Sequence, residues 1–166
     1  MDYSLSDSDL RESIDANIVS YSDIKNYKTI DELLGDNGKC FILYETKKNM
    51  GHWTCLYKYK DTIFFFDPYG NNFDLQLKFI PKQINTALGQ DHKHLIELLY
   101  NSPYKVEFNE YKLQKLGRGI NTCGRWCLVR LQNPSISVSN FKNLFSKKRL
   151  GNIKPDEMIV LLTDAF

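Results

Sequence analysis

The sequence predicts an α+β domain in which helices pack on a mostly antiparallel central sheet. Polar segments typical of short capped helices come first, and three runs rich in aromatic and β-branched residues follow in the middle of the chain. Apolar residues at helical spacing dominate the last quarter. No internal repeat, low-complexity tract or linker divides the chain, so we expect residues 1–166 to form one domain.

Two short helices are expected before the strands. Residues 6–15 are polar enough for a surface helix, with Ser6 or Ser8 as its N-cap. Residues 29–35 begin with Thr29 and carry a glutamate three residues later, which is the spacing of a capping box. The glycine that ends this segment is the residue type that favours a left-handed C-terminal conformation.

Three strands are expected at 39–45, 52–59 and 62–67. Only the polar pair Lys60–Asp61 separates the last two, which predicts a hairpin turn. The sequence Pro-Tyr-Gly at 68–70 ends the third strand, because proline and glycine interrupt regular structure.

Most of the remaining chain is expected to be helical. The segment 78–101 places three leucines on one helical face, and 104–111 alternates like one further strand. From Cys123 onward the apolar spacing predicts a series of helices, with Ser139 as one N-cap and Pro155 in the first turn of the last helix.

Composition favours a soluble intracellular protein with a real core. The 166 residues are 42% hydrophobic, and a domain of this size buries about two-thirds of its unfolded surface. The 22 basic and 20 acidic residues nearly balance, which argues against nucleic acid or a membrane as the main partner. Neither a signal peptide nor a membrane-spanning apolar run is visible, and the four cysteines are expected to be reduced.

Cys123 is a candidate nucleophile. It lies at a loop-to-helix junction, where backbone N–H groups and the helix dipole favour a thiolate, and Gly124 keeps the approach to the sulfur open. Such a nucleophile needs a base. His92 and His94 lie in a polar stretch and are expected to face solvent, whereas His52 begins an apolar strand. His52 is therefore the candidate base.

Asp67 is the candidate partner of that base. If 52–59 and 62–67 pair as a hairpin, the start of the first strand lies beside the end of the second, so His52 and Asp67 fall at the same end of the sheet. A carboxylate there accepts a hydrogen bond from the imidazole and fixes its tautomer, as in a catalytic triad.

Each of these residues also has a purely structural interpretation. Cys123 alone fits a buried thiol, His52 a satisfied structural histidine, and Asp67 a strand-to-turn residue. A zinc site built from Cys123, Cys127 and His52 is disfavoured, because the cysteine spacing is unusual and no fourth ligand suggests itself. We therefore expect no metal and no cofactor. The other cysteines are assigned to the core: Cys40, Cys55 and Cys127.

The order of these motifs resembles the adenovirus-protease and SUMO-protease (Ulp1-like) superfamily of cysteine peptidases. GHWTCLY, then FFFDPYG, then NTCGRWC follow one another along the chain. His52-Trp53 matches the first element of the superfamily, Asp67 the second and Cys123-Gly124 the last. Papain-type enzymes place the cysteine before the histidine, so the order here argues against them.

The resemblance covers roughly residues 39–132 and implies an adenain/Ulp1-type cysteine-protease fold and a cysteine endopeptidase with Cys123, His52 and Asp67 as its triad. The chain looks most like the viral maturation proteases of adenoviruses, virophages, Polinton-type elements and large DNA viruses. The implied substrates are capsid or other structural precursors, cut in the virion or the host-cell cytoplasm by a monomeric enzyme. Stimulation by DNA or a peptide is neither required nor excluded by the sequence.

The oxyanion donor is where the sequence departs from the family pattern. Gln114 matches the family glutamine but lies farther from Cys123 than usual, with Gly117 and Gly119 in a loop that is expected to return it to the site. Asn121, or the backbone N–H of Cys123, is the alternative donor. Losing such a donor costs about 2.7–4 kcal/mol where it has been measured.

Specificity and rival functions follow from the same resemblance. In SUMO-protease relatives the tryptophan after the histidine walls a narrow channel, so Trp53 implies a preference for small residues, especially glycine, before the cleaved bond. Trp53 fits a core residue equally well. The rival functions are a deubiquitinating or deSUMOylating protease and a catalytically inactive binding module, the latter encouraged by the shifted Gln114.

Overall fold

The computed structural model describes residues 4–115 and 121–164, and its centre is one five-stranded sheet in the order β1-β2-β3-β4-β5. The strands are β1 (Asn17–Ser20), β2 (Lys39–Lys47), β3 (Met50–Tyr59), β4 (Thr62–Phe66) and β5 (Lys105–Phe108). The pairings β2–β3 and β3–β4 are antiparallel, whereas β1–β2 and β4–β5 are parallel. The outer pairs are parallel because helical crossovers, and not hairpins, join them.

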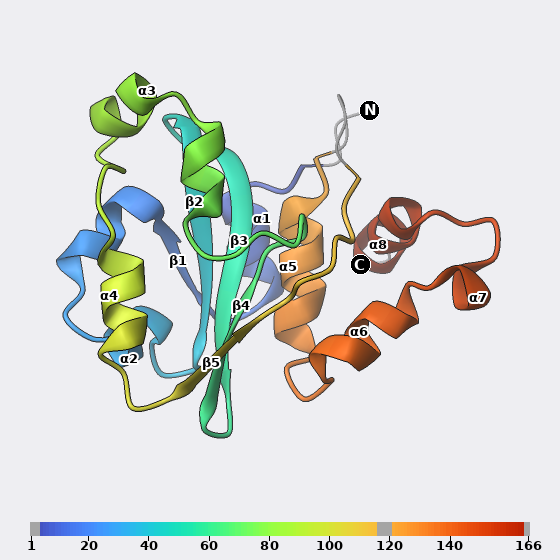
Figure 1. Cartoon of the computed structure of the whole chain (residues 1–166). Helices are drawn as coiled ribbons and strands as arrows, with labels where there is room; N and C mark the ends of the chain where they lie inside the picture. Colours follow the sequence, from blue (N-terminus) through green and yellow to red (C-terminus); the bar gives the residue numbers. More distant parts are fainter. Residues whose placement is uncertain (1–3, 116–120, 165–166) are drawn as a thin grey trace.

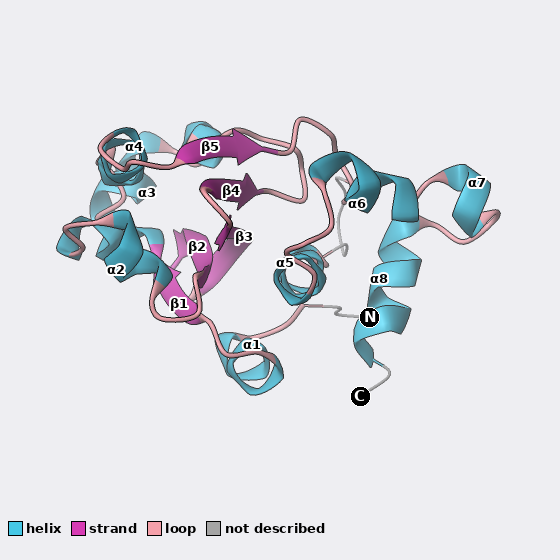
Figure 2. Ribbon diagram, turned by 90° about the horizontal axis from the view of Figure 1, so that it is seen from below, coloured by secondary structure: helices cyan, strands magenta, loops and turns pink. Residues whose placement is uncertain are grey.

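Helices cover both faces of this sheet (Figures 1 and 2). On one face lie α2 (Ile30–Leu34), α3 (Lys82–Ala87) and α4 (His94–Tyr100), and on the other α1 (Asp7–Ser13), α5 (Cys123–Gln132) and α8 (Pro155–Asp164). The remaining elements are η1 (Tyr21–Asn26), η2 (Leu75–Phe79), α6 (Val138–Leu144) and α7 (Lys147–Leu150). The predicted α+β class is confirmed.

Local sequence signals explain most element boundaries. Ser6 accepts from the backbone N–H of Asp9 at 3.2 Å, and Thr29 accepts from that of Glu32 at 3.1 Å, so both predicted N-caps are confirmed. The predicted cap at Ser139 is wrong, because Ser137 caps α6 by accepting from Asn140.

Two other features of the chain differ from the prediction. The segment 78–101 is divided between the end of η2, α3 and α4, with Gly89 between the last two at φ 73°. A left-handed residue there stops the helix. Strand β1 was not predicted, because four residues are too short to show a period on their own.

The sheet is buried on both faces and separates two apolar clusters. Cys40, Ile42 and Tyr44 of β2 point to the face that carries α2 and α4. Phe41 and Leu43 point to the face that carries α5. All four cysteines are free and buried, which confirms the core assignment of Cys40, Cys55 and Cys127. The packing of α5 against β3 fixes the first turn of α5 beside the first residues of β3.

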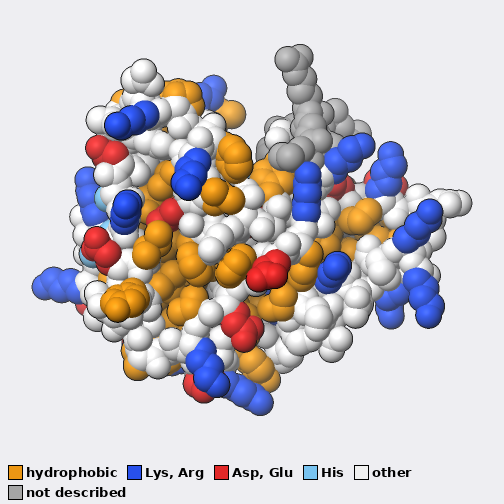
Figure 3. Space-filling model, in the orientation of Figure 1, with side chains coloured by type: hydrophobic (Ala, Val, Ile, Leu, Met, Phe, Trp, Pro, Cys, Tyr) orange, Lys and Arg blue, Asp and Glu red, His pale blue; other side chains and the backbone are white. Residues whose placement is uncertain are grey.

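The surface agrees with a balanced charge. On the face shown in Figure 3, lysine and arginine side chains are spread around the margin and do not form one continuous patch. Within residues 4–115 and 121–164, no helix is long and apolar enough to cross a membrane.

Candidate active site

The hairpin of β3 and β4 brings His52 and Asp67 together. Cys55 pairs with Phe66, so Asp67, the residue after β4, lies beside the first half of β3. His52 Nε2 and Asp67 Oδ1 are 2.7 Å apart, and both side chains are almost completely buried. Because an ionised carboxylate only accepts, the proton of this bond belongs to Nε2. Nδ1 is then the ring nitrogen available to another group.

Asp67 is fixed in place by its own backbone neighbours. The Asn109 side chain donates to the Asp67 carbonyl oxygen at 2.6 Å and accepts from the Asp67 N–H at 3.0 Å. The N–H of Tyr69 donates to Oδ1 at 2.8 Å, and the N–H of Gly70 donates to the Asp67 carbonyl oxygen at 2.7 Å. The carboxylate is therefore held toward His52 before any substrate arrives.

Cys123 is the first residue of α5 and follows the N-cap residue Thr122. Cys123 is 8% exposed and therefore buried at the edge of the core. The backbone N–H of Trp53 lies 3.4 Å from the sulfur and donates to it. A backbone donor and a helix N-terminus both favour negative charge at this position.

The imidazole of His52 interacts with both Asp67 and Cys123. Burial of the ring lowers its pKa, but the hydrogen bond and charge of Asp67, followed by those of Cys123, outweigh burial and raise the pKa of His52 to about 10. A raised pKa favours the protonated ring at neutral pH. With Nε2 bonded to Asp67, Nδ1 is the ring nitrogen that is left for Cys123.

Tyr69 and Gln114 form the next layer of the site. The Tyr69 ring stacks on the His52 ring with centroids 4.5 Å apart and planes at 16°. Burial, then the nearby Cys123 and Asp67, raise the pKa of Tyr69 to about 12, so its hydroxyl stays protonated. Gln114 is buried and its Nε2 donates to the Tyr69 hydroxyl at 3.3 Å. The backbone N–H of Gln114 donates to the Pro68 carbonyl at 3.0 Å, which returns this segment to the turn after Asp67.

The other predicted site residues divide into core and surface. Trp53 is buried, meets the Phe41 ring edge-on at 6.1 Å between centroids, and lies against Gly124, where an added Cβ would be 3.3 Å from Trp53 Cδ1. Asn121 is exposed. The predicted loop glycines, Gly117 and Gly119, lie outside the described residues.

Three residues of the site were not predicted from the sequence. Tyr69 lies inside the Pro-Tyr-Gly turn, so its nearness to Asp67 was visible but its stacking was not. Asn109 follows β5 and reaches Asp67 only through the parallel pairing of β4 and β5. Asp156 of α8 accepts from Thr122 Oγ1 at 2.6 Å, next to the thiol.

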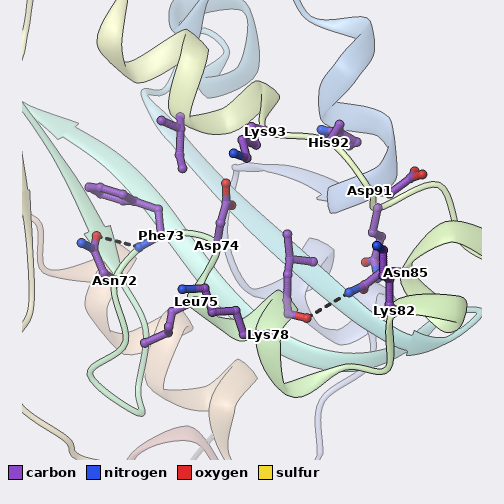
Figure 4. Close-up of a pocket in the computed structure, with 13 residues that line it drawn as sticks. Asn72, Phe73, Asp74, Leu75, Lys78, Lys82, Asn85, Asp91, His92 and Lys93 are labelled. Atoms are coloured by element: carbon purple, nitrogen blue, oxygen red, sulfur yellow. Dashed lines mark hydrogen bonds between the residues drawn. The ribbon is translucent and has the colours of Figure 1, made fainter.

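Two cavities lie near these elements. One of about 560 Å³ borders the nucleophile side, between Leu113, Thr122 and the first turns of α8. Another of about 510 Å³ lies on the opposite face, where Asp74, Lys78, Lys93 and neighbouring residues line it (Figure 4). Its lining contains none of the described residues that contact His52, so this cavity is separate from the site around His52.

The site brings together a thiol, an imidazole and a buried carboxylate. Within the part of the chain that the structure describes, no group of three His, Cys, Asp or Glu side chains is arranged to hold a metal ion. The thiol, the imidazole and the carboxylate together fit nucleophilic attack on a carbonyl carbon.

No protein-family model matches the chain. Among solved structures it is similar to the ASFV protease (16% identity, TM-score 0.36), with 77% of this chain and 42% of that chain covered. It is similar to the central domain of the Lpg1148 protein of Legionella pneumophila (16%, TM-score 0.41, 99% and 96% covered). It is also similar to the Ulp1 protease domain in complex with Smt3, the yeast ortholog of SUMO (16%, TM-score 0.35, 92% and 72% covered). The chain spans less than half the length of the ASFV protease.

A full-length relative is found in a virus. The chain is 40% identical over 163 residues to the protein called "Uncharacterized protein V9" of Sputnik virophage, with 96% of this chain and 93% of the relative covered. Identity at this level over nearly the whole of both sequences shows that the two proteins are related. The protein therefore belongs to the family of protein V9 of Sputnik virophage.

Proposed function

We propose that the protein is a cysteine endopeptidase with Cys123 as nucleophile, His52 as general base and acid, and Asp67 as the group that orients His52. One observation carries the proposal: an imidazole that bonds a buried carboxylate at 2.7 Å also interacts with a cysteine at the first position of a helix. The resemblance of the motif order to the adenovirus-protease and SUMO-protease superfamily supports it independently.

The reaction starts from the thiolate of Cys123 and the imidazolium of His52. The sulfur attacks the peptide carbonyl carbon, and the tetrahedral intermediate collapses as the C–N bond breaks and His52 gives its proton to the leaving amine. A water molecule then attacks the thioester carbonyl, with neutral His52 taking its proton. The C–S bond breaks, the carboxylic acid product leaves, and the thiolate–imidazolium pair is restored.

The oxyanion of both intermediates needs donors that are in place beforehand. Gln114 and the backbone N–H of Cys123 are the donors we propose. Gln114 is supported by its burial and by its bond to Tyr69, which stacks on the catalytic imidazole. Asn121 is exposed and is the weaker candidate.

Viral structural precursors are the proposed substrates, cut where particles assemble. The virophage relative supports a viral setting. Trp53 lies against Gly124, the residue after Cys123. By the resemblance to SUMO-protease relatives, we propose that Trp53 walls a narrow channel that favours glycine immediately before the cleaved bond.

The test is cleavage of virion structural proteins, co-expressed with the wild type or with Cys123→Ala, followed by mass spectrometry of the new N-termini. Fragments with wild type only, and small residues before the cut, are expected. If the structural proteins stay intact while ubiquitin or SUMO fusions are cleaved, the proposed substrate class is wrong and the protein is a deubiquitinating or deSUMOylating protease. If neither kind of substrate is cleaved and Cys123 is unreactive, the protein is a catalytically inactive binding module and not an enzyme.

A further inference from the structure

Asp156, in the first turn of α8, accepts hydrogen bonds from the residue next to Gln114 and from the residue next to Cys123. Asp156 Oδ2 accepts from the backbone N–H of Lys115 at 3.0 Å. Asp156 Oδ1 accepts from Thr122 Oγ1 at 2.6 Å and from Trp126 Nε1 at 3.0 Å. Lys115 follows the proposed oxyanion donor directly, and Thr122 directly precedes the proposed nucleophile.

An acidic residue in the first turn of a helix is ordinary, because it complements the helix dipole. Asp156 differs in where its bonds go. Its three acceptor contacts reach donors outside α8, on the segment after β5 and on α5. By comparison, the neighbouring Glu157 is exposed and, among the described residues, accepts from the local Lys154 N–H at 3.2 Å.

The far end of α8 is tied to the nucleophile helix as well. Arg125, two residues after Cys123, donates to Thr163 Oγ1 at 2.8 Å and to the Asp164 carboxylate. Ile159, between the two ends, is fully buried in the cluster that contains Cys123. Because these contacts hold α8 against α5, the carboxylate on its first turn has a defined position relative to Lys115 and Thr122.

We propose that Asp156 is a positioning residue for the peptidase reaction: it sets the distance between the oxyanion donor Gln114 and the nucleophile Cys123 by holding the residue next to each. This inference rests on the proposed function. By this proposal α8, a helix without a diagnostic sequence motif, acts as a clamp: its Asp156 holds Lys115 and Thr122 at a fixed distance from each other. Misplacing a reacting group by about 1 Å can cost about 100-fold in rate, so a clamp of this kind has a measurable effect.

The two oxygens make the clamp separable by mutation. Asp156→Asn retains Oδ1 for Thr122 and Trp126, but places an amide N–H where Oδ2 accepted from Lys115. We expect kcat on a fluorogenic peptide ending in Gly-Gly-7-amino-4-methylcoumarin to fall by about 10-fold or more, with KM little changed. Alkylation of Cys123 by iodoacetamide needs no oxyanion donor, so its rate should stay within about two-fold of wild type.

Glu157→Gln is the matched control, since it removes the neighbouring carboxylate and should leave both rates unchanged. Hydrogen exchange of the Lys115 amide, measured by NMR, should accelerate in Asp156→Asn but not in the control. Unchanged kcat in Asp156→Asn overturns the proposal. So does a parallel fall of kcat, alkylation and melting temperature, which indicates a purely structural role. If the wild type cleaves no peptide or protein, the proposed function fails, and the positioning role of Asp156 fails with it. The exchange rate of the Lys115 amide still shows whether the contact between Lys115 and Asp156 exists.

Discussion

Replacing Asp67 by asparagine tests the electrostatics of the site without changing its shape. The asparagine side chain has the size of the aspartate, and its Oδ1 can still accept from His52 Nε2 and from the Tyr69 N–H. Among the described residues, the other oxygen of Asp67, Oδ2, is buried without a hydrogen-bond partner, so the new amide nitrogen replaces an atom that makes no bond there. The substitution therefore removes the negative charge and little else.

The expected change in the pKa of His52 follows from the three contributions that set it: burial, Asp67 and Cys123. Burial lowers the pKa, and Asp67 and Cys123 together raise it from 6.5 to about 10. Asp67 contributes more of this rise than Cys123, so losing its charge is expected to bring the pKa of His52 in Asp67→Asn well below the wild-type value of about 10. Because the pKa of the wild-type imidazole is raised, its protonated form persists to high pH. In Asp67→Asn, His52 should lose its proton at a lower pH than in wild type.

The assay is NMR of histidine ¹³Cε1 in selectively labelled protein between pH 5 and 11. Only three histidines contribute signals, so His52 can be assigned by its loss in His52→Ala. Asp74→Asn is the control, because it removes another part-buried carboxylate, which accepts from the Tyr44 hydroxyl and is not among the groups that set the pKa of His52. The reasoning is refuted if His52 titrates at the same pH in wild type and Asp67→Asn, or if Asp74→Asn shifts it equally.

Further predictions concern the nucleophile, the oxyanion donor and the turn after Asp67. Cys123→Ala should abolish cleavage while changing the free energy of unfolding by only about 1 kcal/mol, measured by urea denaturation; residual cleavage would exclude it as nucleophile. Gln114→Ala should lower kcat by about 10²–10³ with an unchanged alkylation rate, and an unchanged kcat would pass the role to Asn121 or to the backbone. Gly70→Ala should destabilise the fold by about 1–3 kcal/mol, because Gly70 has φ 76° and a Cβ would lie 2.6 Å from the Tyr111 carbonyl oxygen; a stability equal to wild type would contradict this geometry.

The sequence was sufficient for the parts of the fold that depend on local chemistry. The capped helices, the β3–β4 hairpin and the α+β class follow from caps, alternation and turn residues close together in the chain. The nearness of His52 and Asp67 was predictable for the same reason, since a hairpin makes neighbours of its two ends. Ser139 was the wrong cap because Ser137, two residues earlier, competes for the same role.

The remaining parts of the site depend on contacts between distant segments. Asn109 reaches Asp67 through a parallel strand pairing, and Asp156 reaches Thr122 from a helix 34 residues farther along the chain. Neither residue type is unusual at its position, so no local pattern marks it. Buried polar groups of this kind are selected by the three-dimensional position of their partners, which a sequence period does not encode.

The most direct test of the central claim is the rate of Cys123 alkylation by iodoacetamide against pH, in wild type and in His52→Ala. If His52 activates Cys123, wild type reacts many-fold faster than His52→Ala at pH 6, where a free thiol is almost fully protonated, and the two rates approach each other at high pH. Two superimposable, slow profiles would contradict the account and make Cys123 a packed core residue.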